Sequence, residues 1–273
     1  MNVTKRNGTV EEINLDKIHK VVDWAAEGLD VSVSQVEIDA QIQFFEGIKT
    51  SQIHDTLIRG AADLISEETP DYQYLAARLA AFAIRKEAYG QFAPPSLAHQ
   101  LSQGVDKGIY DSGLLAQYTM QELMELDRYI DHNRDMDFAY AGIEQLRSKY
   151  LVQDRVSGKV YESPQMAIML LSMAIFSESY KGKQRMRLVK ELYDAVSLFD
   201  VSLPTPIMAG LRTPVRQLSS CVLIEVGDSL DSIKAGSNAI VDYISRKAGI
   251  GLNVGAIRAE GSPIRGGDAR HTG

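Results

Sequence analysis

Residues 70–90, PDYQYLAARLAAFAIRKEAYG, decide the fold of the amino-terminal part of the chain. Alanine and leucine dominate this stretch, and both have high intrinsic helix propensity. Proline is tolerated in the first turn of a helix, so we expect a long helix that begins at Pro70. This helix is the fourth and longest of the helices expected in this part of the chain.

A hairpin and the first helix are expected at the amino terminus. Two short runs of strand-forming residues flank Asn7-Gly8, a dipeptide that tolerates the positive φ angles of a type I′ turn. A helix follows, with Asn14 or Asp16 as its cap, an apolar stripe along one side and a stop near Gly28. The pattern thus predicts a short β structure that leads directly into a helix.

Two further helices complete the amino-terminal group. One is expected over 34–45, and the other begins at a cap formed by Thr50 or Ser51. Together with the helix that begins at Pro70, they predict a β-hairpin cap on a four-helix bundle over residues 1–92.

Pro94-Pro95 marks the next boundary, because proline cannot continue a helix. The patterns that follow are again mainly helical, interrupted by one expected hairpin around Ser157-Gly158. Residues 93–217 are therefore predicted to form a helical domain.

The character of the sequence changes after residue 206. Residues 220–226 form a short apolar run with β-branched residues, which predicts a buried strand. A helix is expected over 229–247 and a second strand over 249–254. Parallel strands in this β-α-β order need further strands beside them, so residues 218–273 are interpreted as the start of an incomplete α/β domain. We expect its apolar edge to meet another chain.

Composition narrows the function classes. There are 29 basic and 36 acidic residues, which gives a net charge of −7 and argues against a nucleic-acid binder. The single cysteine, Cys221, excludes an internal disulfide framework and fits a reducing cytoplasm. No apolar run is long enough to span a membrane, and no secretory signal is present. We therefore expect a cytoplasmic protein without nucleic-acid or membrane partners.

Long ungapped motifs lie in both parts of the chain. The amino-terminal motifs are VTKRNG, INLDKIHKVVDWAAEGL, GIKTSQIHDTLI, PDYQYLAARLA and RKEAYGQF. The later motifs are SLPTPIMAGLRTP, QLSSCVLIEVGDSLDSI, KAGIGLNVGAIRAEGSPIRGG and the terminal HTG. The first group resembles an ATP-cone domain. The second resembles the start of the catalytic domain of the large subunit of class I ribonucleotide reductase, with the enterobacterial aerobic type as its nearest likeness.

The resemblance implies a fold that is mainly α with α/β: an ATP-cone, a helical domain and the first strands of a ten-stranded α/β barrel. It also implies that the radical cysteine, the second redox cysteine, the radical-transfer tyrosines and the carboxyl-terminal cysteine pair lie beyond Gly273. We therefore expect the chain to be the amino-terminal piece of a split large subunit.

The resemblance assigns three residues to the substrate face. From spacing alone, Cys221 would be a small hydrophobic residue, and Thr205 and Ser220 would be ordinary loop and strand residues. By resemblance, Cys221 is one of two thiols that become a disulfide as the ribose is reduced. Thr205 and Ser220 match positions that contact the substrate diphosphate or ribose.

A second set matches the family's specificity site, where a deoxynucleotide or ATP selects the substrate. Its members are Asp228, Arg258 and Arg265. The alternative from spacing alone is a helix-start cap and two surface arginines. The family's site spans a subunit interface and includes a loop beyond this chain, so specificity control by the chain alone is not expected.

A third set matches cone positions that contact ATP or dATP. At one position the sequence departs from the family's pattern: the histidine that the family has in the AAFAIRK segment is Ala83 here. We therefore expect weaker binding of dATP or weaker inhibition by dATP. Each residue of the set taken singly could be a solvated turn or a helix cap. The set comprises Lys5, Arg6, Glu11, Asn14, Lys17, Thr50, His54 and Lys86.

The sequence thus predicts a component of a ribonucleoside-diphosphate reductase that is active only in an assembly. The partners implied by resemblance are a carboxyl-terminal large-subunit chain, the radical-generating small subunit, thioredoxin or glutaredoxin, a ribonucleoside diphosphate and a second large subunit in a dimer. No metal is expected in this chain, since the radical-generating metal centre belongs to the small subunit. The alternatives are a nucleotide-binding regulatory module and an inactive truncated piece.

Overall fold

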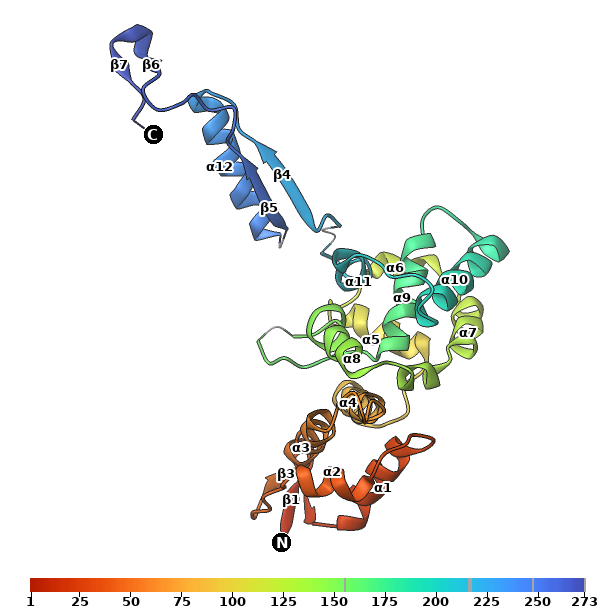
Figure 1. The fold of residues 1–273 in the computed structure, drawn as a ribbon. Coiled ribbons are helices and arrows are strands. Elements are labelled where there is room, and N and C mark those ends of the chain that lie inside the picture. The colour runs from red at the N-terminus through yellow and green to blue at the C-terminus, as the bar shows by residue number, and fades with distance from the viewer. Residues whose placement is uncertain (155, 216–217, 247, 273) are drawn as a thin grey trace. The chain divides into compact units, whose positions relative to one another are not determined.

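A computed structural model describes residues 1–154, 156–215, 218–246 and 248–272. The chain divides into two compact units, Met1–Pro214 and Val215–Gly273. Both are drawn in Figure 1, and each is described by itself. Residues 216–217, where the sequence placed the boundary of the third domain, lie outside the described residues.

The amino-terminal part of the first unit is a small sheet packed on four helices. The expected bundle with its β cap is confirmed (Figure 1). The elements are β1 (Asn2–Thr4), β2 (Val10–Glu12), α1 (Leu15–Ala26), α2 (Val33–Asp39), β3 (Ile48–Lys49), α3 (Thr50–Asp63) and α4 (Tyr72–Tyr89).

The hairpin forms, but its turn differs from the predicted type I′. Gly8 has a φ of +84°, whereas Asn7 is not among the residues with positive φ. The amide of Gly8 donates to the carbonyl of Lys5, and the amide of Lys5 donates to the carbonyl of Thr9. The loop is therefore a turn followed by one left-handed glycine, which is the three-residue type of hairpin connection. A third strand was not predicted: β3 pairs parallel to β1.

The helix boundaries follow local capping, with two corrections. Asn14 caps α1 as expected, since its side chain accepts from the amide of Lys17 at 3.3 Å. The second helix is shorter than 34–45 and ends at Asp39, because Gln41 adopts a left-handed φ of 44°. Thr50 is the first residue of α3 and not its cap.

Helix α4 is the centre of the first core. Leu75, Leu79 and Ile84 are fully buried, and the same apolar cluster includes residues of α1, α2 and α3. Ile143 of the following helical part belongs to this cluster as well. The cone and the helical part therefore share one core, so the predicted boundary near residue 92 is not a break in packing.

The rest of the first unit is helical, as predicted, with a second apolar cluster around α9. Among the described residues the expected hairpin contains one bridge, between Gln153 and Val160, and the amides of Asp154 and Tyr161 donate to the carbonyls of Lys159 and Val152; Arg155 within it lies outside the described residues. The elements are α5 (Leu97–Asp106), α6 (Ser112–Gln117), α7 (Met120–Tyr129), the 3₁₀ helix η1 (His132–Met136), α8 (Tyr140–Gln145), the π-helix η2 (Leu146–Tyr150), α9 (Pro164–Phe176), α10 (Gly182–Ser197) and α11 (Thr205–Gly210).

The second unit contains the expected β-α-β order. Strands β4 and β5 pair in parallel over five residues, beginning with Cys221 opposite Gly249. The helix between them is capped by Ser229, not by Asp228. The elements are β4 (Cys221–Glu225), α12 (Leu230–Ser245), β5 (Gly249–Asn253), β6 (Pro263–Ile264), η3 (Arg265–Gly267) and β7 (Ala269–Arg270).

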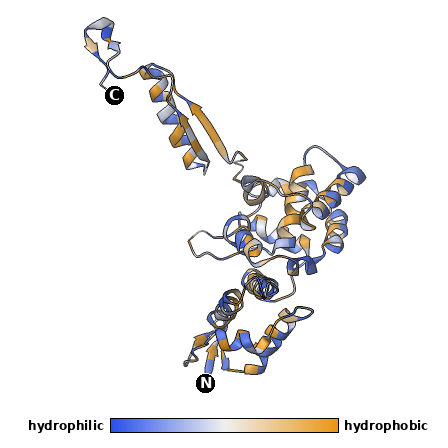
Figure 2. Ribbon diagram, in the orientation of Figure 1, coloured by the Kyte–Doolittle hydropathy of each residue, from blue (hydrophilic) through white to orange (hydrophobic). Residues whose placement is uncertain are grey.

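The prediction of a buried strand is wrong for β4 as it stands in this unit. Ile224 is buried toward α12, but Leu223 on the other face is 75% exposed. Figure 2 shows the hydrophobic colouring that runs along this strand. Two strands covered by one helix leave one face of the sheet open, so an apolar sequence is not sufficient for burial here.

The close approach of α3 to the end of α2 in the cone predicts that a larger residue at Gly60 destabilises the fold. A Cβ added to Gly60 on α3 would lie 2.9 Å from the backbone of Ala40. We expect Gly60→Ala to lower the free energy of unfolding by about 1–3 kcal/mol, because backbone atoms cannot move aside as a side chain can. The measurement is urea denaturation of the whole chain, with circular dichroism as the signal that reports unfolding.

Gly142→Ala on α8 is the matched control. Its Cβ would be 3.6 Å from the ring of Phe138, an ordinary contact. Helix propensity then favours alanine, so we expect a change of less than about 1 kcal/mol in the stabilising direction. Equal effects of the two substitutions would contradict the close-contact explanation.

Candidate functional site

A hollow lies between the hairpin and the amino-terminal ends of two helices in the cone. Its volume is about 620 Å³, part of which is open to solvent. The polar part of its lining comes from the hairpin, the start of α1 and the start of α3. Six of the eight predicted nucleotide residues line it: Arg6, Glu11, Asn14, Lys17, Thr50 and His54.

The charges at this hollow are mainly positive. Glu11 accepts ion pairs from Lys5 and Lys17, each at 3.1 Å, and these bonds lower the pKa of Glu11. Lys86 on α4 extends over the ring of Phe82 at 5.6 Å. Partial burial, and then the positive charges of Arg6 and Lys5, lower the pKa of Lys86. The remaining two predicted residues, Lys5 and Lys86, therefore belong to the same electrostatic environment.

Phe82 and His54 form the inner wall. Their rings stack at a centroid distance of 5.2 Å and an angle of 19°. The Nε2 atom of His54 lies 2.7 Å from the carbonyl oxygen of Leu79, which acts as the acceptor. Burial lowers the pKa of His54 to about 4, so the ring is neutral at pH 7. An aromatic, uncharged wall beside a cationic rim matches the two ends of a nucleotide.

The apolar lining of the hollow was not predicted from the sequence. Phe82, Ile53 and Leu57 line the hollow, and none of them is among the residues predicted from the sequence. For Ile53 and Leu57 the available signal is their helical spacing beside His54 on α3, whereas Phe82 lies on α4 and has no such signal. Ala83 is buried in the core and does not line the hollow.

Two of the three predicted specificity residues meet in the second unit. Arg258 donates from Nε to both carboxylate oxygens of Asp228 at 3.0 and 2.8 Å, and its amide donates to the same carboxylate. Its Nη1 donates to the carbonyl of Pro263. Arg265 is exposed at a φ of 52°, with no contact to this pair among the described residues. The carboxylate and one guanidinium therefore satisfy each other.

The three predicted substrate-face residues are all exposed. Cys221 begins β4, and Ser220 precedes it and accepts a backbone bond from Gly249 at 2.8 Å. Thr205 is the first residue of α11 in the other unit. Thr205 thus belongs to one compact unit and Ser220 and Cys221 to the other, and their common substrate face stays a prediction.

The described residues contain neither a metal-ligand cluster nor a membrane-spanning helix. No group of three His, Cys, Asp or Glu side chains is arranged there to hold a metal ion. None of the described helices is both long and apolar enough to cross a membrane.

Comparison with known families divides the chain into three parts. Residues 1–87 match the ATP cone domain, 136–216 the all-alpha domain of ribonucleotide reductase, and 219–273 its barrel domain. The chain belongs to the ribonucleotide reductase alpha-subunit family. It corresponds to the amino-terminal region of these subunits, with the cone, the all-alpha domain and part of the barrel.

Curated reductase subunits align along nearly the whole chain. The ribonucleoside-diphosphate reductase 1 subunit alpha of Escherichia coli is 61% identical over 272 residues, 99% of this chain. The alpha subunit of Haemophilus influenzae is also 61% identical over 99% of the chain, and that of Enterobacteria phage T4 is 48% identical over all of it. The chain spans 36% of the length of each of these relatives.

The burial of His54 predicts a pH dependence for the stability of this chain. Its pKa is lowered from 6.5 to about 4 in the fold, so the unfolded chain binds the proton more readily. The stability due to neutral His54 is fully present above pH 6.5 and is lost as the pH falls toward 4. Between pH 7.5 and 5 we expect a loss of about 2 kcal/mol from this group.

Other groups titrate in the same range, so the test compares two proteins. Urea denaturation of the wild-type chain and of His54→Asn at both pH values gives four free energies of unfolding. The stability advantage of the wild type should shrink by about 2 kcal/mol at pH 5. An advantage that is independent of pH would show that His54 is not buried as a neutral ring.

Proposed function

We propose that this chain supplies the effector-binding cone, the helical domain and the opening of the catalytic barrel of a ribonucleoside-diphosphate reductase. The observation that carries the proposal is the cone hollow, where six of eight independently matched residues line one space. The reaction requires the remainder of the alpha subunit, either in the same polypeptide or in a separate carboxyl-terminal chain.

The cone hollow binds ATP or dATP in this proposal. The triphosphate lies against the cationic rim, where Arg6, Lys17 and Lys86 neutralise its charge. Asn14 and Thr50 stand at the amino-terminal ends of α1 and α3, whose backbone amides and dipoles favour an anion. The purine packs against the wall formed by His54 and Phe82.

Cys221 takes part in the reduction step. Two thiols give up two hydrogen atoms and become a disulfide, while the ribose C2′ hydroxyl leaves as water and a C–H bond replaces it. The chain has one cysteine, so the second redox sulfur and the thiyl radical that starts the reaction come from sequence outside these 273 residues. Exposure of Cys221 at the start of β4 supports this role, because a redox thiol must be reached by its partner.

Thr205 and Ser220 hold the ribonucleoside diphosphate, and Asp228, Arg258 and Arg265 contribute to the specificity site. The Asp228–Arg258 pair fixes both side chains relative to each other before any nucleotide is present. Deoxynucleoside triphosphates or ATP bind there at an interface with a second large subunit.

The proposed partners follow from the same chemistry. The small subunit supplies the radical and its metal centre, and thioredoxin or glutaredoxin reduces the disulfide. These reactions place the chain in the cytoplasm, which also suits its single free thiol.

A second candidate function is a regulatory module that binds nucleotide without taking part in the chemistry. The division of the chain favours it, because the cone hollow and Cys221 belong to different compact units. The two candidates differ in whether Cys221 matters.

Removal of one cation tests nucleotide binding. Calorimetric titration of the full chain with ATP and with dATP should give one site in the cone. Lys86→Met should weaken ATP binding about tenfold, because a charge-assisted contact to phosphate is worth roughly 1.5 kcal/mol or more. The dATP titration also tests the sequence prediction that Ala83 weakens dATP binding, although Ala83 itself lies in the core and does not line the hollow.

Lys190→Met is the matched control. Like Lys86, Lys190 is a partly buried lysine over an aromatic ring, that of Tyr129, but it lies on α10 and pairs with Glu125 at 2.7 Å. Its replacement should leave ATP affinity unchanged. Equal affinities for the wild type and for Lys86→Met would remove Lys86 from the site.

Replacement of the thiol tests the redox role. The chain, the remaining alpha-subunit sequence and the small subunit are assembled and assayed for CDP reduction with thioredoxin. We expect Cys221→Ser to abolish turnover while ATP still binds to the cone. Ser219→Ala, two residues earlier on the same exposed segment, should retain activity. Continued turnover of Cys221→Ser would favour the regulatory module.

A further inference from the structure

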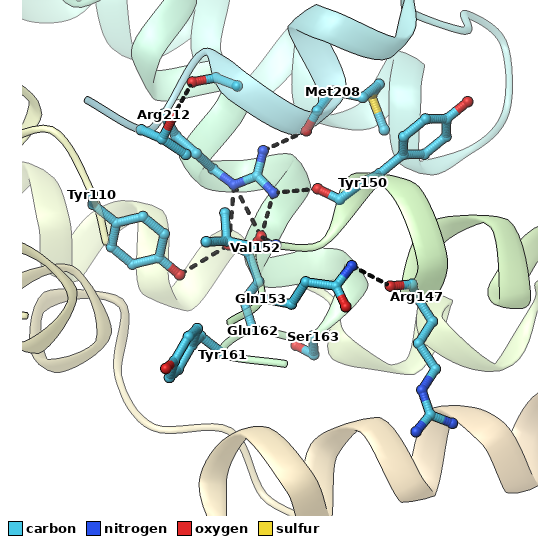
Figure 3. A network of polar contacts seen from close by, with 12 residues as sticks. Tyr110, Arg147, Tyr150, Val152, Gln153, Tyr161, Glu162, Ser163, Met208 and Arg212 are labelled. Carbon is cyan, nitrogen blue, oxygen red and sulfur yellow. Dashed lines mark hydrogen bonds and ion pairs between the residues drawn. The ribbon is translucent and has the colours of Figure 1, made fainter. Parts of the chain in front are cut away.

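We propose that Arg212, held by Glu162, is a positioning residue that sets the location of α11 and thereby of Thr205 at its start. This inference rests on the proposed function, since it assigns the consequence of the contact to substrate binding. Figure 3 shows the network of polar contacts around the Arg212 guanidinium.

Helix α11 has few contacts of its own that could hold it in place. It is six residues long and none of its residues is fully buried; Met208 alone among them packs, partly buried, against the first apolar cluster. Helices this short are not stable alone, because one turn fixes several residues for a single hydrogen bond. Thr205 is exposed at the first position, so its location depends on whatever anchors the other end of the helix.

Arg212 provides that anchor just beyond the end of α11. Its side chain is 1% exposed, and it is the largest of the fully buried side chains. Nη1 donates to the carbonyl of Met208 in the last turn of α11 at 2.5 Å, and Nη2 donates to the carbonyl of Tyr150 at 2.9 Å. The backbone carbonyl of Arg212 accepts from the amide of Asp111 at 3.0 Å. One residue therefore ties α11 to η2 and to the start of α6.

Glu162 fixes the guanidinium from the opposite side. It is fully buried, and both of its oxygens accept from Nε of Arg212, at 3.1 and 3.0 Å, while Nη2 completes the pair. The same carboxylate accepts from the amide of Val152 at 2.7 Å and from the hydroxyl of Tyr110 at 2.9 Å. Every lone-pair direction of Glu162 is thus directed at a fixed donor, and the pair cannot rotate without breaking several bonds.

Burial of such a pair serves geometry more than stability. A buried ion pair costs desolvation that its attraction barely repays, and apolar replacements are often equally stable. A guanidinium, however, offers a rigid planar fork that can bond the carboxylate and two carbonyls at once, which an ammonium cannot do. The structure therefore assigns Arg212 the task of orienting α11.

Arg212→Lys tests the assignment, because it keeps the charge opposite Glu162 and removes the fork. In the complete reductase, KM for the ribonucleoside diphosphate should rise about tenfold at unchanged kcat. The reason is that Thr205 contacts the substrate equally in the ground state and in the transition state, so a misplaced Thr205 weakens binding and not the chemical step. A purely structural effect would instead reduce the active fraction and lower the apparent kcat. Thr205→Val should raise KM by a similar factor, and the double variant should show no further rise.

Arg185→Lys is the matched control. Arg185 is equally buried and bonds the carboxylate of Glu122 twice at 2.9 Å, but it lies on α10 and bonds no residue of α11. It should leave KM unchanged. Additive effects of Arg212→Lys and Thr205→Val, or an equal effect of Arg185→Lys, would overturn the proposal.

A second measurement needs no activity. Hydrogen exchange of the 273-residue chain should show the amides of α11 exchanging at least about tenfold faster in Arg212→Lys than in the wild type, with α3 and α9 unchanged. Unaltered exchange in α11 would overturn the anchoring role even if the enzyme is active. Faster exchange together with an inactive wild-type assembly would leave the anchor intact and reject the proposed function.

Discussion

The burial of α4 is the constraint on which the first unit depends. Ten of its eighteen residues are buried, and they are spread around the helix instead of forming one stripe. A helix of this kind needs partners on several sides. The alanines at 76, 77, 80 and 81 give those partners room to approach: α1 and α3 pack on it from the cone, and α8 and η1 from the helical part. The core is therefore continuous from one part to the other.

The same helix carries polar contacts to both parts within a few residues. Phe82 lines the cone hollow and Lys86 extends over its ring, whereas Arg85 donates to the buried carboxylate of Asp135 at 2.9 and 2.7 Å. Glu87 accepts from the amide of Val160 at 2.8 Å. Burial raises the pKa of Asp135 to about 6, while its bonds to Arg85 act in the opposite direction. The geometry of two donated bonds favours the ionised pair. A nucleotide in the hollow would thus contact an element that also fixes the helical domain.

Much of the fold followed from local patterns, and the errors have local causes. The cap at Asn14 and the long helix of residues 70–90 depend on neighbouring residues, so the sequence predicted them well. The end of α2 at Asp39 and the parallel pairing of β3 depend on residues distant in sequence, and periodicity could not reveal them. The exposure of Leu223 reflects a sheet of two strands with an open face, since apolar sequence predicts burial only where a covering layer is present.

The sequence alone determined which residues carry charge, which thiol is available and which segments form helices. It also grouped the cone residues by resemblance, because long motifs survive as linear strings. Tertiary structure decided that six of them line one hollow, that His54 is neutral there and that Asp228 engages Arg258. It also brought Arg212 to Glu162 across fifty positions of the chain. The physical reason is that burial and pairing are properties of space: a charged side chain loses its water only when distant segments close around it, and that event leaves no periodic mark in the sequence.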